Sequence, residues 1–298
     1  MKDKNQANEV IQQLIQWAEK QALVRAMLLT SSRANPRATV DVFSDYDVIL
    51  VVPDIHPFFE TRSWLQDFGE VLVSYWDPIH PEPDYGIEIF SSVNQYANGL
   101  DIDFSIWPIE LMRLITKKST LPEYLDIGYS TLVDKDHLTD GMQTPTYSAY
   151  IPKPPTEEIF YKVIEDFFSD VPYVAKCLWR EELMPVKWNL DYDMKHNFLR
   201  PMLEWRMELD QNWSMPTGNL GRGLKKQLPS RIWAELERTY AASGIEENWD
   251  ALFRTINLFR EVGIEIAERL GYTYPLEIDQ RITAYAQSVK NYNKESRP

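Results

Sequence analysis

Two aspartates one residue apart, Asp45 and Asp47, open an apolar run at residues 48–52 (V-I-L-V-V). In a strand, residues i and i+2 point to the same face, so both carboxylates can converge on one site. Magnesium prefers hard oxygen ligands and typically takes one or two carboxylates together with substrate phosphates. The pattern indicates a metal site at the start of a buried strand. The alternative is a pair of aspartates in a surface turn.

A second pair of acids lies in the alternating stretch at residues 100–106 (L-D-I-D-F-S-I). Strand alternation places the apolar residues on one face and Asp101, Asp103 and Ser105 on the other. An acid on a central strand is costly unless it is paired or binds a metal. The stretch therefore belongs either to a metal site or to an edge strand with one solvated face.

Together the two pairs suggest a two-metal site for phosphoryl transfer. Asp45 and Asp47 from one strand and Asp103 from another would hold two Mg²⁺ ions about 3.5–4 Å apart and orient a nucleoside triphosphate. Asp103 can also accept the proton of an attacking hydroxyl. These three aspartates are the predicted catalytic and metal-binding residues.

A candidate phosphate turn, S-S-R at residues 31–33, follows the apolar run at 26–30. Backbone N–H groups there, the Ser32 hydroxyl and the Arg33 guanidinium would hold the β and γ phosphates, and Ser31 is assigned to the same nucleotide site. Lys176, farther along the chain, shares a predicted helix with Trp179 and is a further candidate phosphate ligand. Its alternative role is that of a surface lysine.

The first half of the chain has a mixed α and β pattern. Helices are predicted at 8–20, 61–68 and 108–117, from apolar residues at helical spacing and a proline at the first turn of the last one. Strands are predicted at 23–30, 46–52, 71–76, 87–90 and 100–107.

Three prolines cluster near residues 147–155, and beyond them the strand signals stop. Helices are predicted at 156–179, 192–210, 229–243, 249–270 and 276–293. The sequence thus predicts an α+β protein: a mixed-sheet domain at residues 1–150, followed by an all-α helical bundle at 151–298.

The net charge of −14 is concentrated in the first half, which carries −11 against −3 for residues 151–298. A negative field repels nucleic acid and attracts cations, so we expect a metal or a polycationic ligand and no nucleic-acid partner. No apolar run approaches the roughly 18 residues of a membrane span, and the polar N-terminus has no leader pattern. With one cysteine, Cys177, which we expect to be buried and inert, these features favour a cytoplasmic protein without a membrane partner.

The sequence resembles the aminoglycoside 6-adenylyltransferases (streptomycin adenylyltransferases) of the nucleotidyltransferase superfamily. That family has a G-S-R-x-N turn, then D-x-F-x-D-Y-D, W-L-x-x-F-G and I-D-L-T-L-x-P. The similar segments here are S-S-R-A-N at 31–35, D-V-F-S-D-Y-D at 41–47, W-L-Q-D-F-G at 64–69 and I-D-F-S-I-W-P at 102–108, with further likeness at 173–182 and 218–226.

The resemblance implies a nucleotidyltransferase domain, a helical domain that helps form the substrate cleft, and transfer of AMP from ATP to a hydroxyl of a polycationic aminoglycoside such as streptomycin. It assigns Mg²⁺ to Asp45 and Asp47, and the third carboxylate and general base to Asp103. The acidic half of the chain would complement such an acceptor. Acids that could bind its cationic groups are Glu88, Asp101 and Glu182.

Two alternatives remain open. The chemistry could act on another small molecule or on a protein side chain. The chain could also be a nucleotide-binding protein that has lost catalysis, since Ser31 and Asn219 replace a glycine and a lysine of the family pattern. Retention of all three aspartates favours catalysis, because unpaired carboxylates repel each other.

Overall fold

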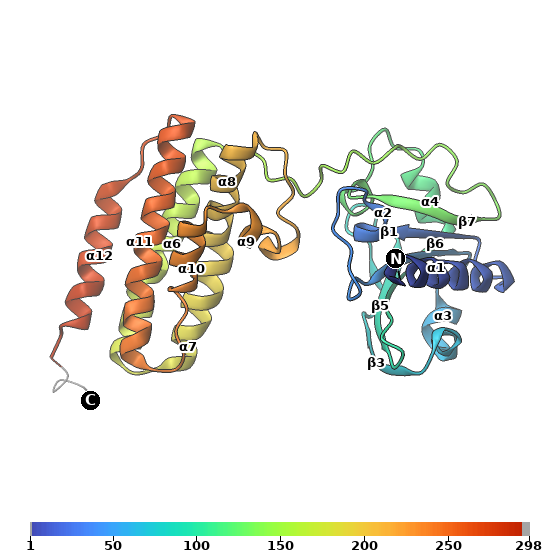
Figure 1. Cartoon of the computed structure of the whole chain (residues 1–298), viewed down its shortest axis with the longest axis horizontal. Coiled ribbons are helices and arrows are strands. Elements are labelled where there is room, and N and C mark those ends of the chain that lie inside the picture. Colours follow the sequence, from blue (N-terminus) through green and yellow to red (C-terminus); the bar gives the residue numbers. More distant parts are fainter. Residues whose placement is uncertain (1, 294–298) are drawn as a thin grey trace. The chain divides into compact units, whose positions relative to one another are not determined.

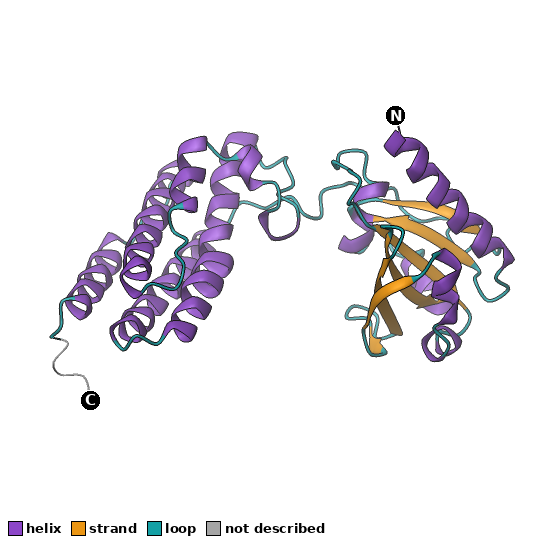
Figure 2. Cartoon of the chain, turned by 60° about the horizontal axis from the view of Figure 1, so that its bottom comes forward, coloured by secondary structure: helices purple, strands orange, loops and turns teal. Residues whose placement is uncertain are grey.

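The computed structural model describes residues 2–293, and of residues 2–6 only the backbone. The chain divides between Ala149 and Tyr150 into two compact units. The first contains a seven-stranded sheet with helices, and the second is built of helices and loops (Figures 1 and 2). The predicted α+β class, with a mixed-sheet domain followed by a helical one, is confirmed.

The sheet of the first unit has the strand order β3-β5-β6-β2-β1-β7, and the short β4 pairs with β5. Strand β2 runs parallel to β6, and the other pairs are antiparallel, so the sheet is mixed. The strands are β1 (Ala26–Thr30), β2 (Tyr46–Val52), β3 (Val71–Trp76), β4 (His80–Pro81), β5 (Glu88–Tyr96), β6 (Asp101–Pro108) and β7 (Tyr129–Asp134).

One face of the sheet packs against helices. Helix α1 (Lys2–Lys20), helix α3 (His56–Glu60) and the 3₁₀ helix η1 (Ser63–Phe68) bury a core that includes Leu14, Leu50 and Phe104. The apolar residues of β2 and β6 alternate between this core and the opposite face, as the pleat of a strand requires.

The opposite face is covered over part of its length. Helices α4 (Ile109–Ile115) and α5 (Glu123–Asp126) bury Ile49, Val51 and Trp107 there. Asp47 and Asp103 lie on this same face, two residues before Ile49 of β2 and four residues before Trp107 of β6. The three predicted metal ligands therefore stand where the helical cover of the sheet ends.

Three local predictions for the first unit need correction. The predicted turn at 31–35 contains a short helix, α2 (Ser31–Ala34). Strand β5 extends well beyond 87–90, because its buried Asn94 side chain finds an acceptor in the Ile102 carbonyl oxygen, 2.9 Å away. Strand β7, which pairs with β1, was not predicted. The exposed residues in its middle are polar, so the sequence has no apolar or alternating run there.

The described part of the second unit, residues 150–293, contains helices and no strand. Thr156 caps the first helix through its hydroxyl oxygen, which accepts a hydrogen bond from the Ile159 N–H. Cys177 is buried in this helix, as expected. The helices are α6 (Glu157–Trp179), α7 (Leu183–Lys187), η2 (Trp188–Leu199), α8 (Arg200–Gln211), η3 (Asn219–Gly221), α9 (Leu224–Gln227), α10 (Ser230–Glu237), α11 (Ile245–Leu270) and α12 (Leu276–Lys290).

The helix predicted at 192–210 is two helices of different type. Residues Trp188–Leu199 form a π-helix, and α8 begins directly after it with Pro201 in its first turn. Proline has no N–H to donate to the preceding turn, so a single α-helix is interrupted at this point. None of the described helices is long and apolar enough to cross a membrane.

Candidate metal centre

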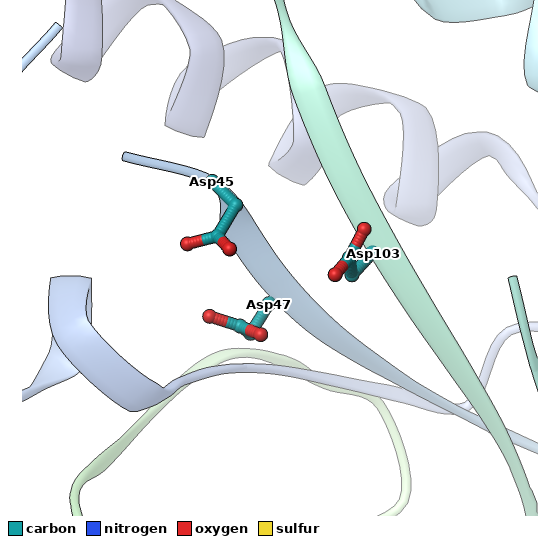
Figure 3. A group of neighbouring side chains, drawn as sticks. All are labelled: Asp45, Asp47 and Asp103. Atoms are coloured by element: carbon teal, nitrogen blue, oxygen red, sulfur yellow. The ribbon is translucent and has the colours of Figure 1, made fainter. Parts of the chain in front are cut away.

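Three carboxylates meet at the uncovered part of the sheet. Asp47 of β2 is paired directly with Asp103 of β6, and Asp45 immediately precedes β2. Each offers one oxygen atom such that the three oxygens lie within 4.8 Å of one another. Figure 3 shows the three side chains on the same side of the two strands. The parallel pairing of β2 with β6 thus brings together residues that are far apart in the sequence.

The three charges are poorly compensated by the described protein groups. Burial, followed by the negative charges of Asp47, Asp101 and Asp45, raises the pKa of Asp103 to about 7. The pKa of Asp47 is raised to about 6, first by burial and then by Asp45. A buried carboxyl group favours its neutral form, and a like charge nearby has the same effect. A bound cation would lower both pKa values, because it favours the charged form of each carboxyl group.

The donor set suits a hard divalent cation. Among the described residues, no hydrogen bond reaches the buried Oδ1 atom of Asp103. A buried carboxylate oxygen without a partner costs free energy unless an ion or another group occupies it. Three carboxylate oxygens in close proximity are the ligands that Mg²⁺ and similar cations prefer. Asp45, Asp47 and Asp103 can therefore hold a metal ion.

The predicted phosphate turn lies beside this centre. The Ser31 hydroxyl lowers the pKa of Asp47 by a hydrogen bond, against the larger effect of burial. Ser31 has a φ of +60°, a left-handed conformation that favours glycine. The Ser31 N–H binds the Gly128 carbonyl oxygen at 3.1 Å. The Ser32 hydroxyl oxygen is buried, and no described group forms a hydrogen bond with it.

Gly128, which was not predicted from the sequence, lies close to the backbone of α2. Gly128 has a φ of +135°, and a Cβ atom there would come within 3.0 Å of the Ala34 carbonyl oxygen. The loop before β7 therefore packs directly against α2. A glycine before a strand is a common sequence feature, and only the pairing of β7 with β1 gives it this position.

Arg33 has a structural task that was not predicted. Its guanidinium donates to the carbonyl oxygens of Asp45 (2.7 Å) and Ser44 (2.5 Å), and lies 3.7 Å from the centroid of the Tyr46 ring. Arg33 thus connects α2 to the loop that presents Asp45. Two carbonyl oxygens and an aromatic face fix its orientation.

The remaining predicted residues are dispersed. Asp101 lies two residues before Asp103 on the same face, and its pKa is raised by burial and by Asp45. Glu88 lies near His56 of α3, because strand alternation places it on the packed face of β5 with Phe90. Lys176 of α6 and Glu182, which precedes α7, are exposed in the second unit.

A mixed sheet with three converging carboxylates beside a small polar turn is typical of enzymes that use metal-bound carboxylates in phosphoryl transfer. The sequence profile of the streptomycin adenylyltransferase family matches residues 4–289, and the chain belongs to this family. The predicted family and enzyme class are confirmed.

The relatives are similar over nearly their full length. The chain is 28% identical over 283 residues to the aminoglycoside 6-adenylyltransferase of Bacillus subtilis (strain 168), covering 94% of this chain and 96% of that protein. It is 28% identical over 293 residues to the enzyme of the same name from Campylobacter jejuni, covering 96% and 97%. A crystal structure of an aminoglycoside 6-adenyltransferase from Bacillus subtilis aligns with 24% identity and a TM-score of 0.44, covering 93% of this chain and 96% of that chain.

Proposed function

We propose that the protein transfers AMP from ATP to a hydroxyl group of an aminoglycoside, with Mg²⁺ as cofactor and pyrophosphate as the second product. The observation that carries the proposal is the convergence of Asp45, Asp47 and Asp103 within 4.8 Å in a member of this family. Relatives with the name aminoglycoside 6-adenylyltransferase support the choice of acceptor.

Each aspartate has a proposed role. Asp45 and Asp47 hold Mg²⁺, and Asp103 is the third ligand and accepts the proton of the attacking hydroxyl. Bound Mg²⁺ would orient the phosphates and neutralise charge at the attacked phosphorus. Asp103 lies directly opposite Asp47 in the sheet, so a base and a metal ligand face the same point.

Asp45, Asp47 and Asp103 are called the triad below. The nucleotide and the acceptor are assigned to groups around it. Ser31, Ser32 and Arg33 belong to α2, and the β and γ phosphates would bind on that side of the triad. Asp101 would bind an ammonium group of the acceptor, whose positive charge is complementary to the net charge of −11 on residues 1–150. Lys176 and Glu182 remain predicted ligands of phosphate and acceptor, whereas Glu88 lies on the opposite face of the sheet from Asp103 and has no part in this proposal.

The test is pyrophosphate release from ATP and Mg²⁺ in the presence of each member of an aminoglycoside panel. We expect release that depends on streptomycin and falls by about 10³-fold or more in Asp103→Asn, which removes the base and a metal ligand. Asp140→Asn is the matched control, because Asp140 is an exposed aspartate of the same unit, 74% exposed, and paired only with His137 among the described ion pairs.

Two results would redirect the proposal. Release with a non-aminoglycoside acceptor alone would keep the chemistry and change the substrate. ATP binding without release for any acceptor would favour a nucleotide-binding protein that has lost catalysis, for which the departure at Ser31 gives a structural reason.

A further inference from the structure

The face of the sheet that bears the triad continues beyond it onto the edge of the sheet. Asp103 of β6 is paired with Val93 of β5, and Val93 is paired with Tyr75 of β3. Directly paired residues share a face, so Asp47, Asp103, Val93 and Tyr75 form one row across four strands. The row passes from carboxylates to apolar side chains within a single strand step.

The outer part of this row is exposed. Tyr75 is 62%, Val93 45% and Val73 64% exposed, and Val73 stands two residues from Tyr75 on the same strand and face. We name Val73, Tyr75 and Val93 the β3 ledge. Neighbouring strands lie about 4.8 Å apart, so the Val93 backbone is about 5 Å and the Tyr75 backbone about 10 Å from that of Asp103. The ledge is thus within the reach of a ligand whose hydroxyl contacts Asp103.

The ledge and the phosphate turn lie on opposite sides of the triad. In the strand order β3-β5-β6-β2-β1, helix α2 follows β1 on one side of Asp47, and β5 and β3 lie on the other side of Asp103. In phosphoryl transfer the attacking and leaving oxygens are roughly in line at phosphorus. If the leaving phosphates bind at α2, the attacking hydroxyl approaches from the side of β5.

We infer that the β3 ledge is the acceptor subsite, where Tyr75 and Val93 contact the ring of the aminoglycoside that carries or adjoins the attacked hydroxyl. This inference rests on the proposed function and adds a specificity-determining residue, Tyr75, to it. The ring of Tyr75 packs against the C–H face of the acceptor and attracts an ammonium group to its π face. Asp101, on the same face between the ledge and Asp45, binds a second cationic group.

The inference is tested with Tyr75→Thr, which removes the ring and retains a residue favoured in strands. We expect the KM for streptomycin to rise about tenfold, as the loss of one aromatic contact predicts, with the KM for ATP unchanged. Calorimetric binding of streptomycin to the protein without ATP or metal should weaken by a similar factor. Tyr75→Phe should behave as the wild type. Leu72→Ala is the control, since Leu72 is 63% exposed on the same strand but lies outside the paired register.

The outcomes separate this inference from the function on which it rests. If the wild type releases no pyrophosphate with any aminoglycoside, the proposed function fails, and the ledge assignment fails with it. If the wild type is active and Tyr75→Thr leaves the KM and the binding of streptomycin unchanged, only the ledge assignment is wrong. A rise in the KM for ATP alone would place the nucleobase on the ledge. A lower sedimentation mass for Tyr75→Thr with unchanged KM would make the ledge a contact between two copies of the chain.

Discussion

A buried carboxylate in the second unit and a half-buried carboxylate in the first unit have opposite surroundings. Asp279 in the second unit is fully buried, and both of its oxygens are paired: Arg260 binds it at two points (2.5 Å each), and the Tyr274 and Thr283 hydroxyls donate to it at 3.0 Å. Asp103 in the first unit faces other carboxylates and has an oxygen that no described group reaches.

The charge of Asp279 stabilises the fold, whereas the unpaired charge of Asp103 is available to a ligand. A buried ion pair with all its hydrogen bonds made is costly to break, whereas three close carboxylates without a cation destabilise the unit that contains them. A site of the second kind is retained against its cost in stability. Unpaired carboxylates on well-packed strands are therefore a better sign of function than burial or charge alone.

The largest expected effect is at the paired site. Asp279→Ala leaves Arg260 without its main partner, and we expect the free energy of unfolding to fall by about 3–5 kcal/mol. Urea denaturation measures the loss. Glu277→Gln is the control, because its exposed pair with Arg281 spans 3.6 Å on the same helix, and it should change stability by less than about 1 kcal/mol. Equal losses for the two variants would show that the buried Asp279 stabilises the fold no more than an exposed carboxylate does.

The next effect is expected at the triad and has the opposite sense. Mg²⁺ at about 100 times its Kd should stabilise the wild type by about 2.7 kcal/mol, because it binds only the folded protein. In Asp47→Asn this gain should disappear, while the metal-free variant should be at least as stable as the metal-free wild type. Thermal unfolding with and without Mg²⁺ measures both quantities. A strongly destabilised metal-free variant would place Asp47 among the charges that hold the fold.

A smaller effect tests the strain beside the triad. Ser31→Gly should stabilise the protein by roughly 0.5 kcal/mol, because glycine adopts a φ of +60° without steric cost, and this gain exceeds the extra chain entropy that glycine loses on folding. Ala34→Gly in the same short helix should destabilise by about 0.5–1 kcal/mol. Chemical denaturation of both variants supplies the comparison, and a loss of stability in Ser31→Gly would show that the hydroxyl contributes more than the backbone strain costs.

The smallest effect concerns a third carboxyl group, in the second unit. Burial, followed by the charges of Asp193 and Asp166, raises the pKa of Asp170 to about 6. Between about pH 4 and pH 6 the folded protein holds a proton that the unfolded chain releases, so stability contributed by this group falls as pH rises through that window. Asp170→Asn should flatten the pH dependence of Tm there, and Glu165→Gln on the same helix should not. An unchanged slope in Asp170→Asn would contradict the raised pKa.

Much of the framework could be predicted from sequence, because buried strands and capped helices leave local patterns. The bounds of β2 and β3 follow directly from apolar and alternating runs. The two aspartate pairs gave the face on which their carboxylates lie. They could not show that β2 and β6 are parallel neighbours with Asp47 opposite Asp103, because register depends on contacts between distant segments.

The remaining features depend on partners that sequence does not reveal. Arg33 was assigned to phosphate from its place in a turn after a strand. The acceptors of its hydrogen bonds in the structure are backbone carbonyls of residues 44 and 45, which every residue type offers. Glu88 was grouped with the cleft acids although strand alternation places it on the packed face. Likewise, the extent of β5 depends on Asn94, a polar residue whose burial is permitted by one carbonyl oxygen of the neighbouring strand.

The pairing of β2 with β6 also has a consequence for how the protein folds. Residues 47 and 103 are 56 positions apart, and β1 and β7, which flank the same site, pair across about twice that distance. Contacts of such long range form slowly, because the intervening chain must lose its freedom before they contribute. The metal ligands can therefore assemble only when most of the first unit is in place, and metal binding should appear late in refolding, as a kinetic report that the sheet is complete.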